Sequence, residues 1–190
     1  ESWRREAGRC FPFYQVQIAP YLYNSKNYSS ALVREAQEWV TRHTAETGLA
    51  VISDCVEDLS TIHPINKRPV GKRLADIALA KKYKVLNRIH ESPFLKHSEV
   101  KGDKIVLTFS SAQNGIVCRD KEAKGMEIAG PDGIFVKANV SINKENQLLI
   151  SSPKIKTPVS ARYCFDDATI GNLFNKEGYP VAPFRTEREF

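Results

Sequence analysis

The run LAVISD at residues 49–54 is the feature that most constrains the fold. It is apolar almost throughout and lacks the alternation of a strand that keeps one face in water. Continuous apolar runs are typical of strands in a parallel sheet whose two faces are both covered. The run therefore predicts a buried parallel strand, and the segments next to it should supply its partners.

Those segments predict a strand–helix–strand–helix order. Residues 11–21, FPFYQVQIAPY, are rich in aromatic and β-branched side chains and predict another buried strand. A helix is expected over residues 31–43, capped by Ser29 or Ser30. A second helix is expected over residues 66–82. Together with the run at 49–54, these elements form a βαβα unit.

Apolar residues recur at helical spacing in both predicted helices. In the first helix they are Leu32, Ala36, Trp39 and Val40. In the second, the residues in register are Val70, Leu74, Ile77, Ala78 and Lys81. We expect each of these faces to pack against the sheet.

Beyond about residue 92 the pattern changes to short strand-like runs separated by turn residues. The runs are residues 104–110, 115–120, 125–130, 134–142, 147–152 and 159–165. Such spacing predicts an antiparallel, sandwich-like β module. The tail, residues 171–187, is expected to be mostly loop that packs back on its neighbours. We therefore predict two domains, an α/β part at residues 1–91 and a β-rich part at 92–190.

Composition excludes several classes of protein. With 42% hydrophobic and 26% charged residues the chain is globular rather than disordered. No run approaches the roughly 20 apolar residues of a membrane helix, so no membrane span is expected. The net charge of +6 comes from scattered basic residues without a recognition motif, so we do not expect nucleic-acid binding.

The cysteines give little support to a metal site. Four are present, far apart and without CxxC spacing, and we expect buried free thiols, although the pattern leaves disulfides undecided. They are Cys10, Cys55, Cys118 and Cys164.

His63 is the best candidate for catalysis. It lies in the loop after the strand at 49–54, at the edge where open α/β sheets bind ligands. Pro64 follows it and restrains its backbone. Asp54 and Asp58 are close in sequence, and either could hold one ring nitrogen while the other nitrogen takes a proton. Equally, Asp54 could only cap a turn and Asp58 could be a solvated loop charge.

A histidine base of this kind needs a nucleophile, which these residues do not supply. No GxSxG elbow or similar glycine-flanked serine opens a helix. Cys55 is adjacent to Asp54, which should raise rather than lower its thiol pKa. Residues 1–10 have the spacing and closing glycine of a helix end but no start signal. We therefore expect the nucleophile in polypeptide upstream of residue 1.

Several segments, taken in order, resemble the C-terminal half of sialate O-acetylesterases. They are FPFYQVQIAPY, ALVREAQEW, GLAVISD, IHPINKRPVGKRLA and GNLFNKEGYPVAPFRTE. The resemblance implies part of the flavodoxin-like parallel sheet of SGNH-type serine esterases, followed by a β domain. It also implies hydrolysis of O-acetyl esters of sialic acid or another acetylated glycan, without a cofactor or metal. An extracytoplasmic location (secreted, periplasmic or lysosomal) is expected on the same basis.

The resemblance also assigns roles to residues. His63 corresponds to the catalytic base, and the serine and oxyanion donors belong to the N-terminal half, which is thus an expected partner. The acid of SGNH enzymes commonly stands three residues before the histidine, where this chain has Ser60. Asp54, Asp58 or a backbone carbonyl remain as alternatives for the orienting group. Arg34 is expected to support the active-site side of the sheet.

The competing interpretation is a non-catalytic, β-rich carbohydrate-binding or packing module. As an enzyme, the chain alone is expected to be inactive, because the serine lies elsewhere.

Overall fold

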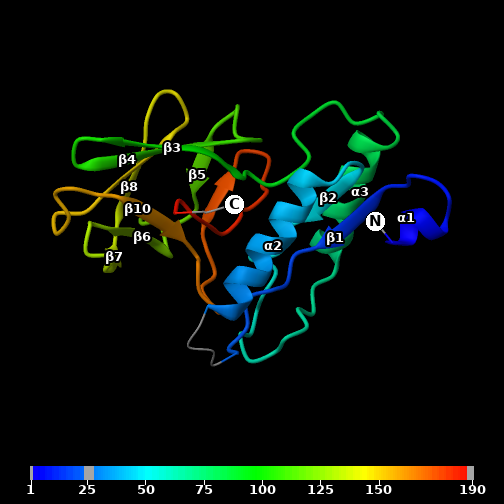
Figure 1. The fold of residues 1–190 in the computed structure, drawn as a ribbon, viewed down its shortest axis with the longest axis horizontal. Helices are drawn as coiled ribbons and strands as arrows, with labels where there is room; N and C mark the ends of the chain where they lie inside the picture. The colour runs from blue at the N-terminus through cyan, green and yellow to red at the C-terminus, as the bar shows by residue number, and fades with distance from the viewer. Residues whose placement is uncertain (1, 24–27, 188–190) are drawn as a thin grey trace.

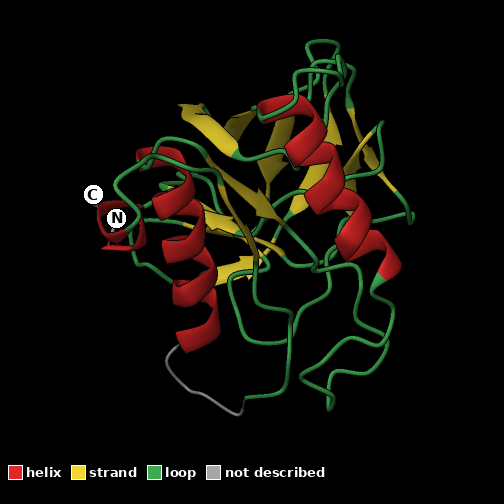
Figure 2. Cartoon of the chain, turned by 90° about the vertical axis from the view of Figure 1, so that its right-hand side faces the viewer, coloured by secondary structure: helices red, strands yellow, loops and turns green. Residues whose placement is uncertain are grey.

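The computed structural model describes residues 2–23 and 28–187, and it begins with a small α/β region (Figure 1). Its elements are α1 (Ser2–Glu6), β1 (Phe13–Val16), α2 (Ser29–His43), β2 (Thr47–Ala50) and α3 (Arg68–Lys81). Strands β1 and β2 pair in parallel, with Phe13 opposite Thr47 and Val16 opposite Ala50. Helices α2 and α3 lie on opposite sides of the strands (Figure 2). The predicted strand–helix–strand–helix order is confirmed.

Gly48 allows α3 to lie close to this sheet. A Cβ at this position would stand 2.5 Å from Cγ2 of Ile77 and 3.0 Å from the ring of Tyr14. Ile77 itself is 1% exposed, as the predicted register of α3 requires. A residue with a side chain would therefore force α3 away from the strand.

The rest of the chain forms antiparallel sheets, as predicted. The strands are β3 (Leu95–Lys101), β4 (Lys104–Phe109), β5 (Ile116–Cys118), β6 (Met126–Ala129), β7 (Phe135–Lys137), β8 (Asn139–Ile142), β9 (Leu148–Ser151), β10 (Ser160–Tyr163), β11 (Leu173–Asn175) and β12 (Phe184–Arg185). One sheet has the order β3-β4-β9-β8 and another β12-β10-β6-β7, while β11 pairs with β5. We call residues 95–187 the β module.

Three details of the β module differ from the prediction. Residues 134–142 form two strands in different sheets, because the chain passes between the sheets at the buried Ala138. The tail does pack back on its neighbours, but it contributes strands β11 and β12 rather than loop alone. Strand β3, whose side chains are mostly exposed, was not expected as a separate element.

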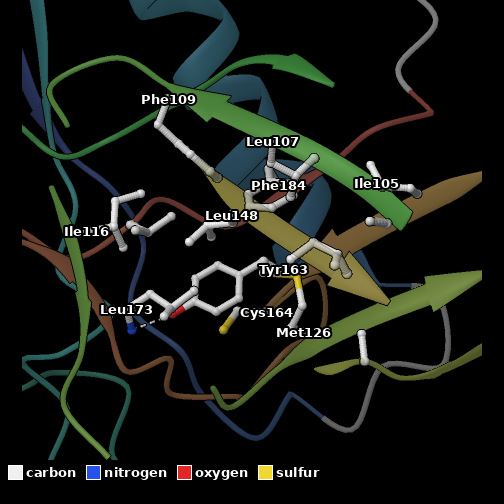
Figure 3. Packing of buried hydrophobic residues seen from close by; sticks show 14 of the residues in the cluster. Ile105, Leu107, Phe109, Ile116, Met126, Leu148, Tyr163, Cys164, Leu173 and Phe184 are labelled. Atoms are coloured by element: carbon white, nitrogen blue, oxygen red, sulfur yellow. Dashed lines mark hydrogen bonds between the residues drawn. The ribbon is translucent and has the colours of Figure 1, made fainter. Parts of the chain in front are cut away.

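The main hydrophobic core belongs to the β module (Figure 3). Side chains from β4, β6, β9, β10, β11 and β12 meet there, and Leu107, Ile128 and Leu148 are fully buried. Tyr163 is 1% exposed, and its hydroxyl accepts a hydrogen bond from the backbone N–H of Leu173 at 3.0 Å. This core therefore contains a polar group whose partner is supplied by the tail.

Helix α2 contradicts the expected burial. Its predicted apolar face is exposed, with Leu32, Trp39 and Val40 at 44%, 38% and 41%. The buried residues are instead Ser30, Ala31, Arg34, Glu35 and Glu38. The reason is that the β module packs on the charged face of the helix.

Specific bonds hold that charged face. Arg185 donates to both carboxylate oxygens of Glu35 at 3.0 and 3.1 Å, and Arg34 donates to the backbone carbonyl of Asp166. The capping prediction was also wrong, because the N-cap is Tyr28 in a left-handed conformation. The Ser30 hydroxyl instead donates to Asp167 at 2.6 Å.

The β module and Phe94 just before it also cover one side of β2. Leu49 and Val51 form one buried cluster with Phe94 and Ala182. Further along the tail, the Tyr179 hydroxyl donates to Asp76 on α3 at 2.6 Å. The α/β region therefore relies on the β module for much of its packing. None of the described helices is long and apolar enough to cross a membrane.

Candidate active site

The His63 loop, residues 51–67, leaves the carboxyl end of β2 and leads into α3. The segment after β1 lies beside it, since the backbone N–H of Leu22 donates to the carbonyl of Leu59 at 2.9 Å. Both segments thus follow the carboxyl ends of parallel strands, which is where open sheets form their binding sites. The loop on which the sequence placed a base is at this edge.

His63 is exposed on that loop, whereas Pro64 next to it is buried. Among the residues that the structure describes, none forms a hydrogen bond or ion pair with the His63 ring. The buried proline anchors the backbone, and the imidazole extends from that anchor into the solvent. Such a side chain is free to meet a group from outside this chain.

Asp54 has a different partner from the one expected. Its two carboxylate oxygens accept hydrogen bonds from Nη1 and Nη2 of Arg73, each at 2.6 Å. Nη1 also donates to the carbonyl of Val51 at 2.7 Å. Burial lowers the pKa of Arg73, but the hydrogen bonds and charge of Asp54 outweigh burial and raise it overall. The pair fixes the start of the His63 loop to α3.

Asp58 closes a turn within the same loop. It accepts hydrogen bonds from the backbone N–H of Ser60 at 2.8 Å and from the Ser60 hydroxyl at 2.7 Å. The Thr61 hydroxyl adds a longer bond of 3.2 Å. The Ser60 N–H and hydroxyl bonds hold the pKa of Asp58 below its ordinary value. Ser60, which stands where the resemblance places an acid, is thus a partner of Asp58.

The structure gathers His63, Asp54 and Asp58 on one loop without joining the carboxylates to the imidazole. In the described part of the chain the hydrogen bonds of both aspartates go to other groups. The assignment of an orienting acid therefore stays a prediction. Arg73 was missed by the sequence reasoning. An aspartate at the end of a buried strand needs a cationic partner, and that need was the available signal.

The thiols do not offer an alternative nucleophile in this loop. All four cysteines are free; Cys55 and Cys164 are buried as expected, Cys118 is half-buried, and Cys10 is exposed contrary to expectation. Burial and the neighbouring Asp54 raise the pKa of Cys55 to about 11. At neutral pH this side chain is a protonated thiol.

Arg34 lies under the same edge but points toward the β module. It is 2% exposed, and burial lowers its pKa. Its Nε and Nη1 atoms have no hydrogen-bond partner within the described structure. The carbonyl of Arg34 accepts a bond of 3.2 Å from Gln17, just after β1. Arg34 thus links the sheet edge, α2 and residue 166 of the β module.

No family model and no curated protein matches this chain. A solved structure does: that of XAC1771, described as a novel carbohydrate acetylesterase from Xanthomonas citri. It is 34% identical to this chain, superimposes with a TM-score of 0.90, and matches 99% of this chain. The chain is related to a carbohydrate acetylesterase. It spans 44% of the length of that protein, so the larger part of the relative has no counterpart here.

Proposed function

We propose that this chain is the C-terminal portion of a carbohydrate esterase that removes O-acetyl groups from a sugar. The observation that carries this proposal is the match along 99% of the chain to a carbohydrate acetylesterase. The exposed His63 on a loop at the carboxyl end of β2 adds a chemical reason. The serine comes from polypeptide outside these residues, consistent with a relative more than twice as long.

His63 serves as the general base and acid of this reaction. The neutral imidazole takes the proton of the serine hydroxyl while the serine oxygen attacks the acetyl carbonyl. The imidazolium then returns that proton to the sugar oxygen, which leaves as a hydroxyl while the acetyl group stays on the serine. Water, activated in the same way, attacks the acetyl-serine and releases acetate. No cofactor is required by this sequence of steps.

The two aspartates contribute either by holding the His63 loop in place or by accepting a hydrogen bond from the His63 ring. Asp54 holds the start of the loop on Arg73, and Asp58 closes the turn just before His63. Either carboxylate, once the upstream residues are in place, is a candidate to hold the second ring nitrogen. The substrate proposed is an acetylated sialic acid, on the basis of the segment IHPINKRPVGKRLA and its companions. We also propose an extracytoplasmic location, on the basis of the same resemblance.

The test uses the complete protein, including the preceding polypeptide. His63→Ala should lower kcat on 4-nitrophenyl acetate by about 10²–10⁴-fold, the usual contribution of a general base. His97→Ala is the matched control, because His97 is an exposed histidine on β3. A wild-type kcat in His63→Ala would show that His63 is not the base. Absence of turnover in the wild-type protein would favour the non-catalytic module instead.

The sugar is identified by a second measurement. Acetate release from O-acetylated sialic acid is compared with release from acetylated xylo-oligosaccharides at equal ester concentration. A higher kcat/KM for the sialic acid ester supports the specific proposal. A lower kcat/KM for the sialic acid ester would still support an esterase, but one that acts on another acetylated glycan.

A further inference from the structure

A basic cleft lies where the end of helix α2 meets the β module. Its volume is about 300 Å³, which is enough for one small molecule. The cations of Arg42, Lys96 and Arg185 line it, and they come from α2, β3 and β12 respectively. No aspartate or glutamate is among its lining residues in the described part of the chain. A cleft lined by one sign of charge favours a ligand of the opposite sign, here an anion.

The two arginines of the cleft are held in place by other residues of the chain. Nη2 of Arg42 donates to the carbonyl of Leu95 at 2.7 Å and lies 3.0 Å from Glu38. Nε and Nη2 of Arg185 donate to Glu35 at 3.1 and 3.0 Å. Glu38 and Glu35 are 1% and 6% exposed, so they fix the guanidinium groups without lining the cleft. The arginines are therefore positioned before any ligand arrives, which lowers the cost of binding.

Lys96 is placed at the cleft by an irregularity in β3. Leu95 is opposite Phe109 and His97 is opposite Thr108, so Lys96 is an extra residue without one across from it. Such a bulge redirects a side chain and is frequent beside binding sites. Among the residues that the structure describes, none forms a hydrogen bond or ion pair with the Lys96 ammonium. The bulge thus supplies the cleft with a cation that has no carboxylate of its own.

The cleft also has an aromatic wall. Trp39 lines it and is 38% exposed. The indole stacks on the ring of His43, with centroids 4.3 Å apart and planes at 16°. His43 in turn donates from Nδ1 to the carbonyl of Trp39 at 2.8 Å, which fixes the stack. Ser98 adds a hydroxyl to the lining. A flat apolar face beside cations and a hydroxyl suits a ligand with a ring, an acidic group and polar edges.

We propose that this cleft binds a carboxylate-bearing sugar, with the carboxylate on Lys96 and Arg185 and the sugar ring against Trp39. The inference rests on the proposed function only in choosing a sugar over another cyclic organic acid. Helix α2 ends at His43, shortly before β2 begins, whereas the His63 loop leaves the other end of β2. A sugar in the cleft is therefore held at the opposite end of the strand from His63.

The first test is a titration of the complete protein with sodium glucuronate and with glucose, which has the same ring without the carboxylate. NMR follows the indole N–H of Trp39, identified as the resonance that Trp39→Phe lacks. We expect a saturable shift with glucuronate and about tenfold weaker binding of glucose, which cannot form the charge-assisted hydrogen bonds. No shift with glucuronate, or equal affinity for glucose, would overturn the proposal.

Sodium acetate and inorganic phosphate test whether the sugar ring matters. Both carry negative charge but offer nothing to stack on Trp39. We expect each to bind more weakly than glucuronate at the same ionic strength. Equal or tighter binding of either ion would show a general anion site and reject a sugar ligand.

Lys96→Ala tests the residue that the bulge supplies. It should weaken glucuronate binding about tenfold, because a hydrogen bond between charged groups is lost. Lys104→Ala is the matched control, since Lys104 is an exposed lysine of β4 that does not line the cleft. Equal affinities in the two variants would remove Lys96 from the site and overturn the proposal.

These binding measurements do not depend on turnover. A protein that binds glucuronate in the cleft but does not hydrolyse acetyl esters would keep the sugar site and reject the esterase. A protein that hydrolyses acetyl esters but does not bind glucuronate would keep the esterase and reject the site.

Discussion

Arg73 and Asp54 form an ion pair with two hydrogen bonds, in which each terminal nitrogen donates to one carboxylate oxygen at 2.6 Å. The side chains are 9% and 15% exposed. The pair joins α3, which carries Arg73, to Asp54, the last residue of the run at 49–54. It therefore determines where the His63 loop starts.

Asp54→Asn should destabilise the protein by about 3 kcal/mol, because removing one partner leaves the buried charge of Arg73 uncompensated. Urea unfolding of the complete protein measures this change in free energy. Since Arg73 already occupies both carboxylate oxygens, we expect kcat per folded molecule to change little. A loss of 10²-fold or more in a folded Asp54→Asn protein would instead identify Asp54 as the group that orients His63.

Glu99→Gln is the control for this prediction. Glu99 and Lys101 also form an ion pair, at 3.0 Å, but their side chains are 51% and 60% exposed. Exposed pairs contribute about 0–1 kcal/mol. Comparable destabilisation in both variants would show that the Arg73–Asp54 pair has no special role in holding the loop.

Asp58 should titrate below the ordinary aspartate range of about 3.9. The hydrogen bonds from Ser60 stabilise its ionised form and lower its pKa. A carboxyl whose folded pKa is depressed stabilises the fold above the unfolded pKa, and that contribution is lost as the pH falls through the folded pKa. The turn that Asp58 closes in the His63 loop should therefore loosen as the pH falls through this pKa.

Carbon-detected NMR titration of the Asp58 carboxyl measures this pKa directly. Ser60→Ala removes the hydroxyl bond and retains the backbone bond, so the midpoint should rise part of the way toward the ordinary value. An Asp58 midpoint at or above that value in the wild-type protein would contradict the turn seen here.

Local patterns were enough to predict the order of elements in the α/β region and the antiparallel sheets after it, but not strands β3, β11 and β12. The run at 49–54 and the turn residues of the second half depend on neighbours in sequence, and the parallel pair and antiparallel sheets followed. The buried face of α2 was not predictable in this way. It is decided by Asp166 and Arg185, which lie more than a hundred residues away and cover Arg34 and Glu35.

The candidate site likewise has a part that local sequence predicts and a part that depends on packing. The position of His63 follows from the strand before it and the proline after it, both of which are local signals. The hydrogen-bond partners of the aspartates do not follow from local signals. Asp54 and Asp58 are both near His63 in sequence, so spacing alone could not tell which groups they bind. Only the packing of α3 brings Arg73 to Asp54. Sequence spacing thus predicted the loop and the place of His63 on it, but not the hydrogen bonds within the loop.

Cys55 and Cys164 should resist alkylation in the native protein. They are 5% and 2% exposed, and burial raises the pKa of both thiols, that of Cys55 to about 11. Iodoacetamide at pH 8 should leave both unmodified, as measured by mass spectrometry of tryptic peptides, because the thiolate is the reacting species. Denatured protein is the control and should be modified at both positions. Rapid native modification of Cys55 would mean that the start of the His63 loop is open.

Tyr163→Phe should destabilise the β module by about 1–3 kcal/mol, the cost of leaving a buried donor unpaired. The Tyr163 hydroxyl is the acceptor for the Leu173 N–H at 3.0 Å, and the side chain is 1% exposed and lies among the core residues drawn in Figure 3. Tyr83→Phe is the matched control, since Tyr83 is 67% exposed and should change the free energy of unfolding little. Hydrogen exchange adds a local readout, because the Leu173 amide should lose its protection in Tyr163→Phe alone. Unchanged stability together with a protected Leu173 amide would show that another acceptor serves this N–H, and that the tail is held without Tyr163.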